Sequence, residues 1–334
     1  MFKMHLSFNS LIAQERAKKL LKKSFYREKM SHAYLFRGPA GVGKKRCALT
    51  FAAYINCLSP VDQDVCGKCS SCVKFRSGNH PDLLLIQPEG VHIKIKQVRE
   101  LKRRLTYPPF EAMHRVVLFE DIHNTMCRKE VANSLLKTLE EPPENTILIL
   151  TADEAGDILA TIISRCQVIP FHSLPYDLVS KALMLKNDIS EENAATLAAV
   201  AEGSIGKAKL LLKKDLLSFR REIVERLLRL TKGRPESVEI IFNLAETAAK
   251  LKENLYELLD LIKVWLRDLI LLATGASESM LISRDLFPFM EAAQKRWNLK
   301  ELSDRLILIN KAGKQLDRNC NRTLVCEALF FSLL

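Results

Sequence analysis

The stretch LFRGPAGVGKKRCAL, residues 35–49, decides how the first half of the chain is expected to fold. From Gly38 to Gly43 and Lys44 it has the spacing G-x-x-x-x-G-K of a phosphate-binding loop. In such a loop, backbone N–H groups and the lysine hold phosphates, and the following Ser or Thr places its hydroxyl on Mg²⁺. Here Lys45 takes the position of that hydroxyl. The stretch leaves three alternatives: a working nucleotidase, a nucleotide-binding relic or a chance match.

The segments around this loop alternate between strand-like and helix-like patterns. Short apolar runs predict strands at 32–36, 82–87, 115–120 and 146–151, and helical periodicity predicts helices at 44–56, 95–105 and 129–141. Repeated strand–helix units predict an α/β domain with a parallel sheet, whose ligands lie at the carboxyl ends of the strands. The loop follows a predicted strand and precedes a predicted helix, which favours a true phosphate loop over a chance match.

After about residue 175 the strand pattern disappears and amphipathic helices follow. Residues 190–212 predict a helix, a turn from Gly203 to Gly206 and a second helix. The change of period predicts an α/β domain at 1–172, a small helical lid at 173–212 and an all-α domain at 213–334.

Composition and charge narrow the classes of protein. The start of the chain lacks the apolar core of a signal peptide, and no apolar run approaches the roughly 18 residues of a membrane span. We therefore predict a cytoplasmic protein with no membrane partner. The net charge of +12 suits a polyanionic partner, although a solvated lysine-rich surface would give the same number.

Four clustered cysteines predict a metal site in an insert at 57–72. Cys57, Cys66, Cys69 and Cys72 have the spacing C-x8-C-x2-C-x2-C, and Gly67 lies in the tight turn between them. Four thiolates complete a closed tetrahedral Zn²⁺ site of structural type. A redox-active C-x-x-C is the alternative, but the fourth cysteine favours zinc.

Two acidic residues end the third predicted strand. Glu120 and Asp121 lie where P-loop hydrolases place carboxylates for Mg²⁺ and for the attacking water. Their order is Glu-Asp rather than Asp-Glu, and a shift of each carboxylate by one methylene is enough to spoil a catalytic geometry. Acidic residues that merely end a strand are the alternative.

The chain resembles the AAA+ clamp-loader subunits of bacterial DNA polymerase III, and among them the delta-prime family. The resemblance rests on residues 9–44, the cysteine insert, HPDLLLI (80–86), the segment 131–154 with LLKTLEEPP, TIISRCQVIPF (161–171) and EGSIGKA (202–208). It covers residues 8–212 well and the last third faintly. It implies an AAA+ module, a lid and a helical collar within a hetero-pentameric ring that contains motor and delta subunits. The complex would load a sliding clamp onto primed DNA, and the polymerase chemistry would lie in another subunit.

The resemblance also implies roles for individual residues. Arg165, in Ser164-Arg165-Cys166, would be an arginine finger for the nucleotide of a neighbouring subunit, with a surface ion pair as the alternative. Lys207 occupies the lid position that in active relatives is usually an arginine near the γ-phosphate. Thr151 would sense the same phosphate, with Asp153 as a competitor.

Four departures from active relatives argue against hydrolysis at this chain's own site: Lys45, the exchanged acids Glu120 and Asp121, Lys207 in place of arginine, and Ala13 where Gly usually precedes Gln14. Gly38, Gly41, Gly43 and Lys44 would retain phosphate affinity. ATP with Mg²⁺ at this site stays an open alternative.

We therefore predict a non-hydrolysing stator with absent or weak ATPase activity. The first alternative is an ATP-hydrolysing motor subunit of the same complex. The second is a free-standing zinc-containing DNA-binding protein, which the SRC and LLKTLEEPP motifs disfavour.

Overall fold

The computed structural model describes residues 5–88, 92–125, 129–154, 158–185, 189–231 and 233–334. The chain divides into two compact units, Met1–Leu174 and Pro175–Leu334. The first is an α/β unit and the second is helical, so the predicted fold class is confirmed. The division into three domains at 172 and 212 stays a prediction. Among the described helices, none is long and apolar enough to cross a membrane.

A five-stranded parallel sheet forms the centre of the first unit, with strand order β2-β3-β4-β1-β5. Its strands are β1 (Ala33–Arg37), β2 (Leu83–Ile86), β3 (Arg115–Phe119), β4 (Thr146–Ala152) and β5 (Gln167–Pro170). The four predicted strands are confirmed, and β5 was missed. This short edge strand pairs only with β1 and exposes its first two side chains, so it lacks the apolar run of a central strand.

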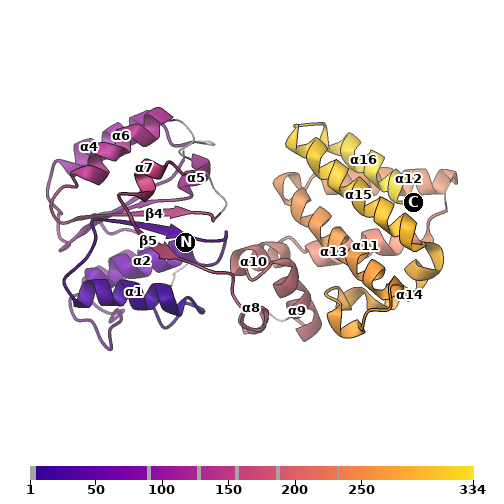
Figure 1. The fold of residues 1–334 in the computed structure, drawn as a ribbon, viewed down its shortest axis with the longest axis horizontal. Helices are drawn as coiled ribbons and strands as arrows, with labels where there is room; N and C mark the ends of the chain where they lie inside the picture. The colour runs from indigo at the N-terminus through magenta and orange to yellow at the C-terminus, as the bar shows by residue number, and fades with distance from the viewer. Residues whose placement is uncertain (1–4, 89–91, 126–128, 155–157, 186–188, 232) are drawn as a thin grey trace. The chain divides into compact units, whose positions relative to one another are not determined.

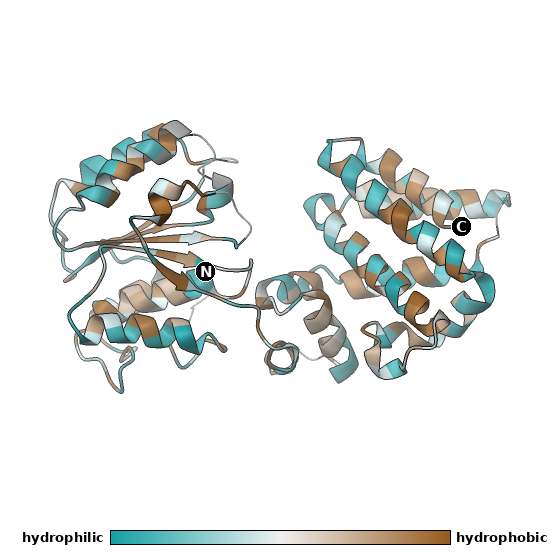
Figure 2. Ribbon diagram, viewed as in Figure 1, coloured by the Kyte–Doolittle hydropathy of each residue, from teal (hydrophilic) through white to brown (hydrophobic). Residues whose placement is uncertain are grey.

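Helices cover both faces of the sheet, with α1 (Glu15–Tyr26) and α2 (Lys44–Ile55) on one face and α4 (Ile95–Leu105) and α6 (Lys129–Glu140) on the other (Figure 1). The three predicted helices are confirmed as α2, α4 and α6. Shorter helices are α3 (Ser70–Ser77), α5 (Ile122–Thr125) and α7 (Ala160–Ile163). The strands are mostly apolar, whereas the helices carry apolar residues on one side and polar residues on the other (Figure 2).

The topology makes the carboxyl end of β1 the expected position for a ligand. The chain leaves β1 toward α2 on one face, whereas β2 and β3 lead to α4 and α6 on the opposite face. β1 lies between β4 and β5, so neighbouring connections diverge here. In open parallel sheets, ligands bind at such switch points. The phosphate loop starts at this position.

The second unit contains only helices among its described residues. They are α8 (Tyr176–Met184), α9 (Glu191–Val200), α10 (Ile205–Lys213), α11 (Leu216–Arg229), α12 (Pro235–Ala249), α13 (Leu255–Ala273), α14 (Phe287–Arg296), α15 (Leu299–Asp317) and α16 (Arg322–Leu333), with 3₁₀ turns at 252–254, 278–280 and 284–286. The predicted helix–turn–helix is present as α9 and α10. The predicted end of its turn was wrong, because Gly206 is already inside α10, whose N-cap is Ser204.

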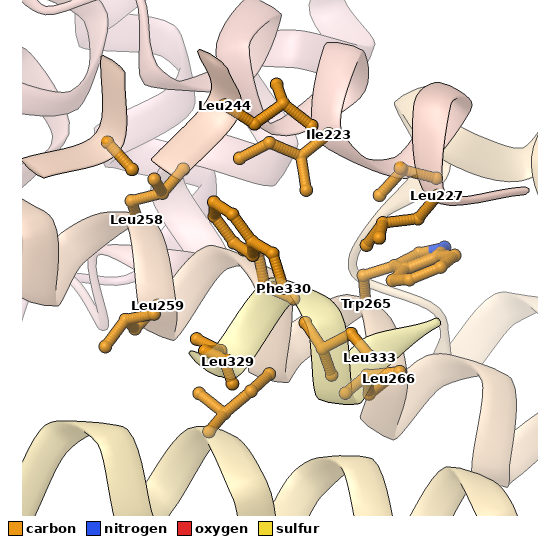
Figure 3. Close-up of a cluster of buried hydrophobic side chains, with 14 of the residues drawn as sticks. Ile223, Leu227, Leu244, Leu258, Leu259, Trp265, Leu266, Leu329, Phe330 and Leu333 are labelled. Carbon is orange, nitrogen blue, oxygen red and sulfur yellow. The ribbon is translucent and has the colours of Figure 1, made fainter. Parts of the chain in front are cut away.

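The core of this unit joins side chains from helices far apart in sequence (Figure 3). The buried side chains shown there are Ile223 and Leu227 of α11, Leu244 of α12, Leu258, Leu259, Trp265 and Leu266 of α13, and Leu329, Phe330 and Leu333 of α16. Each buried large apolar side chain contributes roughly 1.5–3 kcal/mol. The last helix is therefore an integral part of the core.

Asp82 fixes the loop between α4 and β3. Its buried carboxylate accepts hydrogen bonds from the backbone N–H groups of Phe110, Glu111 and Ala112 at 2.7, 2.9 and 3.0 Å, and Arg115 Nη2 lies 3.3 Å away. Burial alone would raise the pKa of Asp82, but the three N–H donors and Arg115 hold the pKa below its ordinary value. The HPD stretch is therefore a structural clamp.

We expect Asp82→Ala to lower the free energy of unfolding by about 3–5 kcal/mol at pH 7, because it leaves the Arg115 guanidinium buried without its counter-ion. Since the folded pKa of Asp82 is depressed, the carboxylate contributes stability above its ordinary pKa of 3.8, and this is lost as the pH falls through the lower folded pKa. Urea unfolding at pH 7 and pH 3 measures both effects. Glu144→Ala, at an exposed loop position, is the control. Equal stability of the two variants at pH 7 would contradict the clamp.

Candidate functional site

The phosphate loop connects β1 directly to α2. Gly38, Gly41 and Gly43 have φ values of 155, 70 and 104°, and Gly43 is the N-cap of α2. The first-turn N–H groups of Lys44, Lys45 and Arg46 form no hydrogen bond with the described part of the chain, as expected at a helix N-terminus. The strand–loop–helix context needed for phosphate binding is therefore present.

Gly38 is required because the backbone just after β5 passes very close to it. A Cβ atom on this residue would lie 2.2 Å from the carbonyl oxygen of Phe171. The Gly38 N–H also donates to the carbonyl of Ala152 at 3.2 Å. Gly38 thus lies between the ends of β4 and β5, where only a hydrogen atom fits.

We expect Gly38→Ala to destabilise the chain by about 1–3 kcal/mol, because the backbone of Phe171 must move to admit the methyl group. Thermal unfolding measures this. The control is Gly313→Ala in α15, where a Cβ meets nothing within 4 Å, and we expect it to stabilise the helix by about 0.5–1 kcal/mol. A Gly38→Ala variant that melts with the unmodified protein would show that the loop has room.

Lys44 is buried and binds acceptors of the chain itself. Its Nζ donates to the carbonyl of Gly38, to the carbonyl of Pro39 at 2.8 Å and to Asp153 Oδ1 at 2.7 Å. An ammonium has three N–H donors, so the three acceptors satisfy it. A phosphate at this lysine must displace at least one of them.

Lys45 contacts the first of the two acidic residues after β3. Its Nζ lies 2.7 Å from Glu120 Oε1, and Gln87 Nε2 donates to the same oxygen at 3.1 Å. Glu120 is mostly buried, whereas Lys45 is half-exposed. Lys45, which stands where the hydroxyl for Mg²⁺ is expected, is therefore paired with Glu120, the carboxylate expected to face Mg²⁺. The sequence did not reveal the roles of Gln87 and this ion pair.

Thr151 and Asp153, the two candidates for sensing the γ-phosphate, lie at the end of β4. Phe119 of β3 pairs with Leu150, so the residues after β3 lie beside Thr151. The buried Thr151 Oγ1 accepts from the Asp121 N–H at 3.0 Å. Asp153, the predicted competitor, contacts Lys44 directly. Its carboxylate also lies 3.3 Å from His123 Nε2, and ligand atoms of Asp121, His123 and Asp153 lie within 4.8 Å of one another.

Lys207 belongs to the second unit. It lies in the first turn of α10, and its Nζ is 3.6 Å from Asp260 Oδ2 of α13. This pair links the two helices. Its predicted contact with a γ-phosphate stays a prediction.

Arg165 follows α7 and forms an ion pair with the LLKTLEEPP segment. Its Nη2 lies 2.5 Å from Glu140 Oε1 at the end of α6, and its Nη1 donates to the carbonyl of Thr161 at 2.9 Å. Both charged side chains are partly exposed. An exposed pair of this kind contributes about 0–1 kcal/mol. The guanidinium can therefore leave Glu140 at low cost.

The four predicted metal ligands converge. All four Sγ atoms lie within 4.8 Å of one another, with Cys72 to Cys57 at 3.5 Å and Cys66 to Cys72 at 3.9 Å. Zn–S bonds of about 2.3 Å in a tetrahedron place sulfurs about 3.8 Å apart. The cluster therefore has the dimensions of a Zn²⁺ site, and four converging thiols fit a metal better than a redox pair.

Backbone N–H groups support the thiolates in this cluster. The N–H of Cys66 donates to Cys57 Sγ, that of Cys69 to Cys66 Sγ and that of Cys72 to Cys69 Sγ, at 3.3–3.4 Å. Such donors favour the ionised sulfur, and those of Cys69 and Lys68 lower the pKa of Cys66 to about 6, whereas burial raises the pKa of Cys57 and of Cys72. Gly67 has a φ of 70°, as its place in the tight turn predicted.

The insert is tied to the start of the chain by Asp64, which sequence reasoning missed. Its carboxylate accepts from Ser7 Oγ at 2.6 Å and from the N–H groups of Phe8 and Asn9 at 3.0 and 3.2 Å. No sequence signal marks this contact, because the partners are more than fifty positions apart. The cysteine insert therefore holds the N-terminal segment in place.

Ala13, one of the departures noted in the sequence, lies in a turn that favours glycine. Ala13 and the following Gln14 have positive φ, 52° and 63°, a region that glycine adopts without strain. The Gln14 amide donates to the carbonyl of His172 at 2.6 Å and accepts from its N–H at 3.2 Å. A glycine before the glutamine would fit this turn better than Ala13.

Comparison with known proteins matches both units. The family described as "DNA polymerase III, delta subunit" matches residues 13–175, and "DNA polymerase III, delta subunit, C terminal" matches residues 214–333. The DNA polymerase III subunit delta' of Bacillus subtilis is 31% identical over 322 residues, which cover 96% of each chain. The chain belongs to the delta-prime family of DNA polymerase III subunits.

Members of related subunit families are also similar. The DNA polymerase III subunit tau of Bacillus subtilis is 32% identical over 224 residues, 65% of this chain and 39% of that protein. The crystal structure of a gamma subunit-related protein from Thermotoga maritima covers 94% of this chain and 97% of its own, with 19% identity and a TM-score of 0.47.

Positive charge in this delta-prime family member gathers on two helices of the first unit. The exposed cations are Arg16, Lys19 and Lys23 of α1 and Lys96, Arg99, Lys102, Arg103 and Arg104 of α4. These stripes suit either alternative left by the net charge, a polyanionic partner or a solvated surface.

Proposed function

We propose that the chain is a non-hydrolysing stator subunit of a clamp loader. Its partners are motor and delta subunits in a hetero-pentameric ring, which loads a sliding clamp onto primed DNA in the cytoplasm. The Lys45–Glu120 ion pair carries the proposal. An ammonium at the hydroxyl position, bound to the nearest carboxylate, removes two of the groups that an active P-loop enzyme gives to Mg²⁺.

The proposed domains have different tasks. Residues 1–172 form the AAA+ module with its structural Zn²⁺, residues 173–212 form the lid and residues 213–334 form the collar. Large apolar side chains remain exposed on α12, α15 and α16, namely Phe242, Ile307 and Leu324. Exposed apolar side chains on several helices support a role of the collar in assembly.

Arg165 is proposed as the residue that acts on a neighbour. It is held near the protein surface by Glu140 in a weak pair, and its guanidinium matches phosphate geometry. The stator would thus complete another subunit's site while its own remains inactive.

A motor subunit is the second candidate, supported by the similarity to tau over 65% of this chain. It requires Lys45 to leave Glu120 and a water to take the place of the hydroxyl. Membership in the delta-prime family favours the stator. The free-standing DNA-binding protein has no comparable support.

We expect the isolated chain to hydrolyse ATP far more slowly than the ~1–100 s⁻¹ of efficient phosphoryl-transfer enzymes. Lys45→Thr alone should not restore hydrolysis, because the Glu120-Asp121 order remains. Steady-state phosphate release with Mg²⁺ measures both. A turnover within that range for the unmodified chain would support the motor candidate.

Reconstitution tests the role in loading. Clamp loading onto primed DNA is measured with the motor and delta subunits, with and without this chain. The proposal expects loading to require the chain although the chain does not turn over ATP. Undiminished loading in its absence would refute it.

A further inference from the structure

A cavity of about 730 Å³ lies against α1 in the first unit and is lined mainly by cations. Asn9 and Gln63 also line it, and Glu15 is the one acidic residue among the described residues around it. The cationic side chains come from α1 and from the residue after it: Lys18, Lys19, Lys22, Lys23 and Arg27. An anion is therefore the class of ligand that this cavity, here called the α1 cleft, fits.

Two of the lysines are held by the chain itself. Lys18 Nζ donates to the carbonyl of Leu11 at 2.7 Å and to Glu15 Oε1 at 2.8 Å. Lys22 Nζ lies 5.2 Å from the centre of the Phe8 ring, in a cation–π contact. Because Lys18 pairs with the acidic residue of the cleft, the carboxylate of Glu15 opposes an incoming anion only weakly.

The other three cations have no counter-ion in the described part of the chain. Lys19, Lys23 and Arg27 are exposed, and none of them forms an ion pair with a described residue. They are spaced four residues apart, so the helical rise separates successive members by about 6 Å along the axis. Like charges at this spacing repel one another, and the helix dipole offsets the repulsion only in the last turn. Such a row of cations matches a chain of single phosphates better than one compact phosphate group.

Tyr26 adds an aromatic ring beside this row. It is 68% exposed, and it lines both the α1 cleft and a neighbouring cavity of about 1290 Å³. That second cavity is lined by Glu28, Asp62 and Glu144, whose carboxylates repel phosphates. A chain of phosphates is therefore confined to the α1 cleft, with the ring of Tyr26 at its boundary.

We propose that the α1 cleft binds single-stranded nucleic acid, with phosphates on Lys19, Lys23 and Arg27 and an unpaired base stacked on Tyr26. Proteins hold single strands with a cationic groove beside exposed aromatic rings, because each nucleotide offers a phosphate and each base a π face. The proposal goes beyond the proposed function, which gives this chain no contact of its own with nucleic acid. It does not depend on the phosphate loop.

The wall of the cleft is fixed by the cysteine insert. The carboxylate of Asp64 accepts from the Asn9 N–H at 3.2 Å, and Gln63 lies directly before Asp64 with a φ of 56°. Asn9 and Gln63 are exposed, and their side-chain amides donate and accept hydrogen bonds. They can therefore contact phosphate oxygens or base edges from a wall that is already in place.

Fluorescence anisotropy of the full chain with a labelled oligothymidine tests the proposal. The strand is about 12 nucleotides long, within the range of known single-strand sites, and the same strand annealed to its complement is measured beside it. The Kd is measured at several NaCl concentrations. Each phosphate bound on a single strand contributes about 0.7 to the slope of log K against log salt, so the three cations should account for a slope of about −2. The duplex should bind several-fold more weakly, because its paired bases cannot stack on Tyr26.

Two kinds of variant separate charge from stacking. Joint replacement of Lys19, Lys23 and Arg27 by Ala should raise the Kd for the single strand about tenfold at low salt and remove about 2 from the slope. Tyr26→Ala should raise the Kd several-fold and leave the slope unchanged, because stacking releases no counter-ion. Tyr26→Phe keeps the ring and should bind as the unmodified chain does.

The matched control removes the same charge from another helix. Lys96, Arg99 and Lys102 of α4 are exposed, and their joint replacement by Ala lowers the net charge by the same amount. This control should change the Kd by less than about twofold, because α4 lies on the other face of the sheet and its charges are screened by salt. Melting curves check that the variants are folded, as expected for alanine at exposed helix positions.

Four results would overturn the proposal: no binding of the single strand at low salt, duplex binding as tight as single-strand binding, an unchanged Kd with Tyr26→Ala, or an equal loss of affinity with the α1 and α4 replacements. The last would show attraction by net charge rather than by the cleft. None of them decides the stator role, which the clamp-loading reconstitution tests separately.

Discussion

Arg165→Ala is expected to slow the DNA- and clamp-stimulated ATP hydrolysis of a reconstituted clamp loader. A guanidinium supplied in trans is worth roughly 10³–10⁵ in rate in well-studied phosphoryl transfers, so the neighbouring site should lose most of its activity. Other sites in the ring keep their own residues, and the total rate therefore falls less than the rate at that one site. Arg165→Lys should restore activity only in part, because an ammonium lacks the planar fork.

The ion pair with Glu140 supplies the matched control. Glu140→Gln removes the negative charge from the same 2.5 Å contact and leaves the guanidinium in place. Both substitutions should change the free energy of unfolding by about 1 kcal/mol or less, since the pair is exposed. If Arg165 acts on a neighbour, only its own replacement slows hydrolysis.

Two results would contradict the trans role. One is an unchanged rate of ATP hydrolysis and clamp loading with Arg165→Ala. The other is an equal loss with Glu140→Gln and Arg165→Ala, which would show that the contact between α6 and the segment after α7 matters, rather than the guanidinium.

Removal of the metal is expected to have the largest effect on stability. We expect one Zn²⁺ per chain at the four cysteines, and structural Zn²⁺ contributes about 10–16 kcal/mol of apparent binding free energy in small peptides at pH 7. Without it, the cysteine sulfurs, 3.5–3.9 Å apart, lose the metal ion that would hold them together, and the insert should unfold locally. Asp64 lies in this insert, so the segment from Ser7 to Asn9 should lose its anchor as well.

Metal analysis and thermal unfolding of Cys72→Ser measure this effect. The variant should be zinc-poor and melt well below the unmodified chain, and a strong chelator should reproduce the shift. Cys320→Ser, at an exposed cysteine outside the cluster, should change neither quantity. Zinc-free protein of normal stability, or full zinc content in Cys69→Ser, would refute the assignment.

Patterns local in sequence were enough to predict most of the first unit. The central strands β1, β3 and β4 are apolar runs because both faces of a central parallel strand are buried, and the edge strand β2 was found because its sequence LLLI is apolar as well. The loop glycines and the cysteine spacing carry their geometry within a few residues, and both were found in place. β5 was not predicted, because it begins with Gln167 and the exposed Val168 and so has no continuous apolar run.

The ion pairs around the phosphate loop form because the sheet brings residues together that are far apart in the sequence. Lys45 and Glu120 are 75 positions apart and meet only because β1 and β3 both flank β4, so that the residues after them share one edge. The sequence by itself determined β1 to β4, the phosphate loop and the candidate zinc ligands, because these follow from periodicity and spacing along the chain. Tertiary structure alone decided that Lys45 neutralises Glu120, that Asp153 occupies Lys44 and that Glu140 holds Arg165. The physical reason is that a charge pair forms where strand order and helix packing bring two side chains within a few ångströms, and no local pattern encodes that distance.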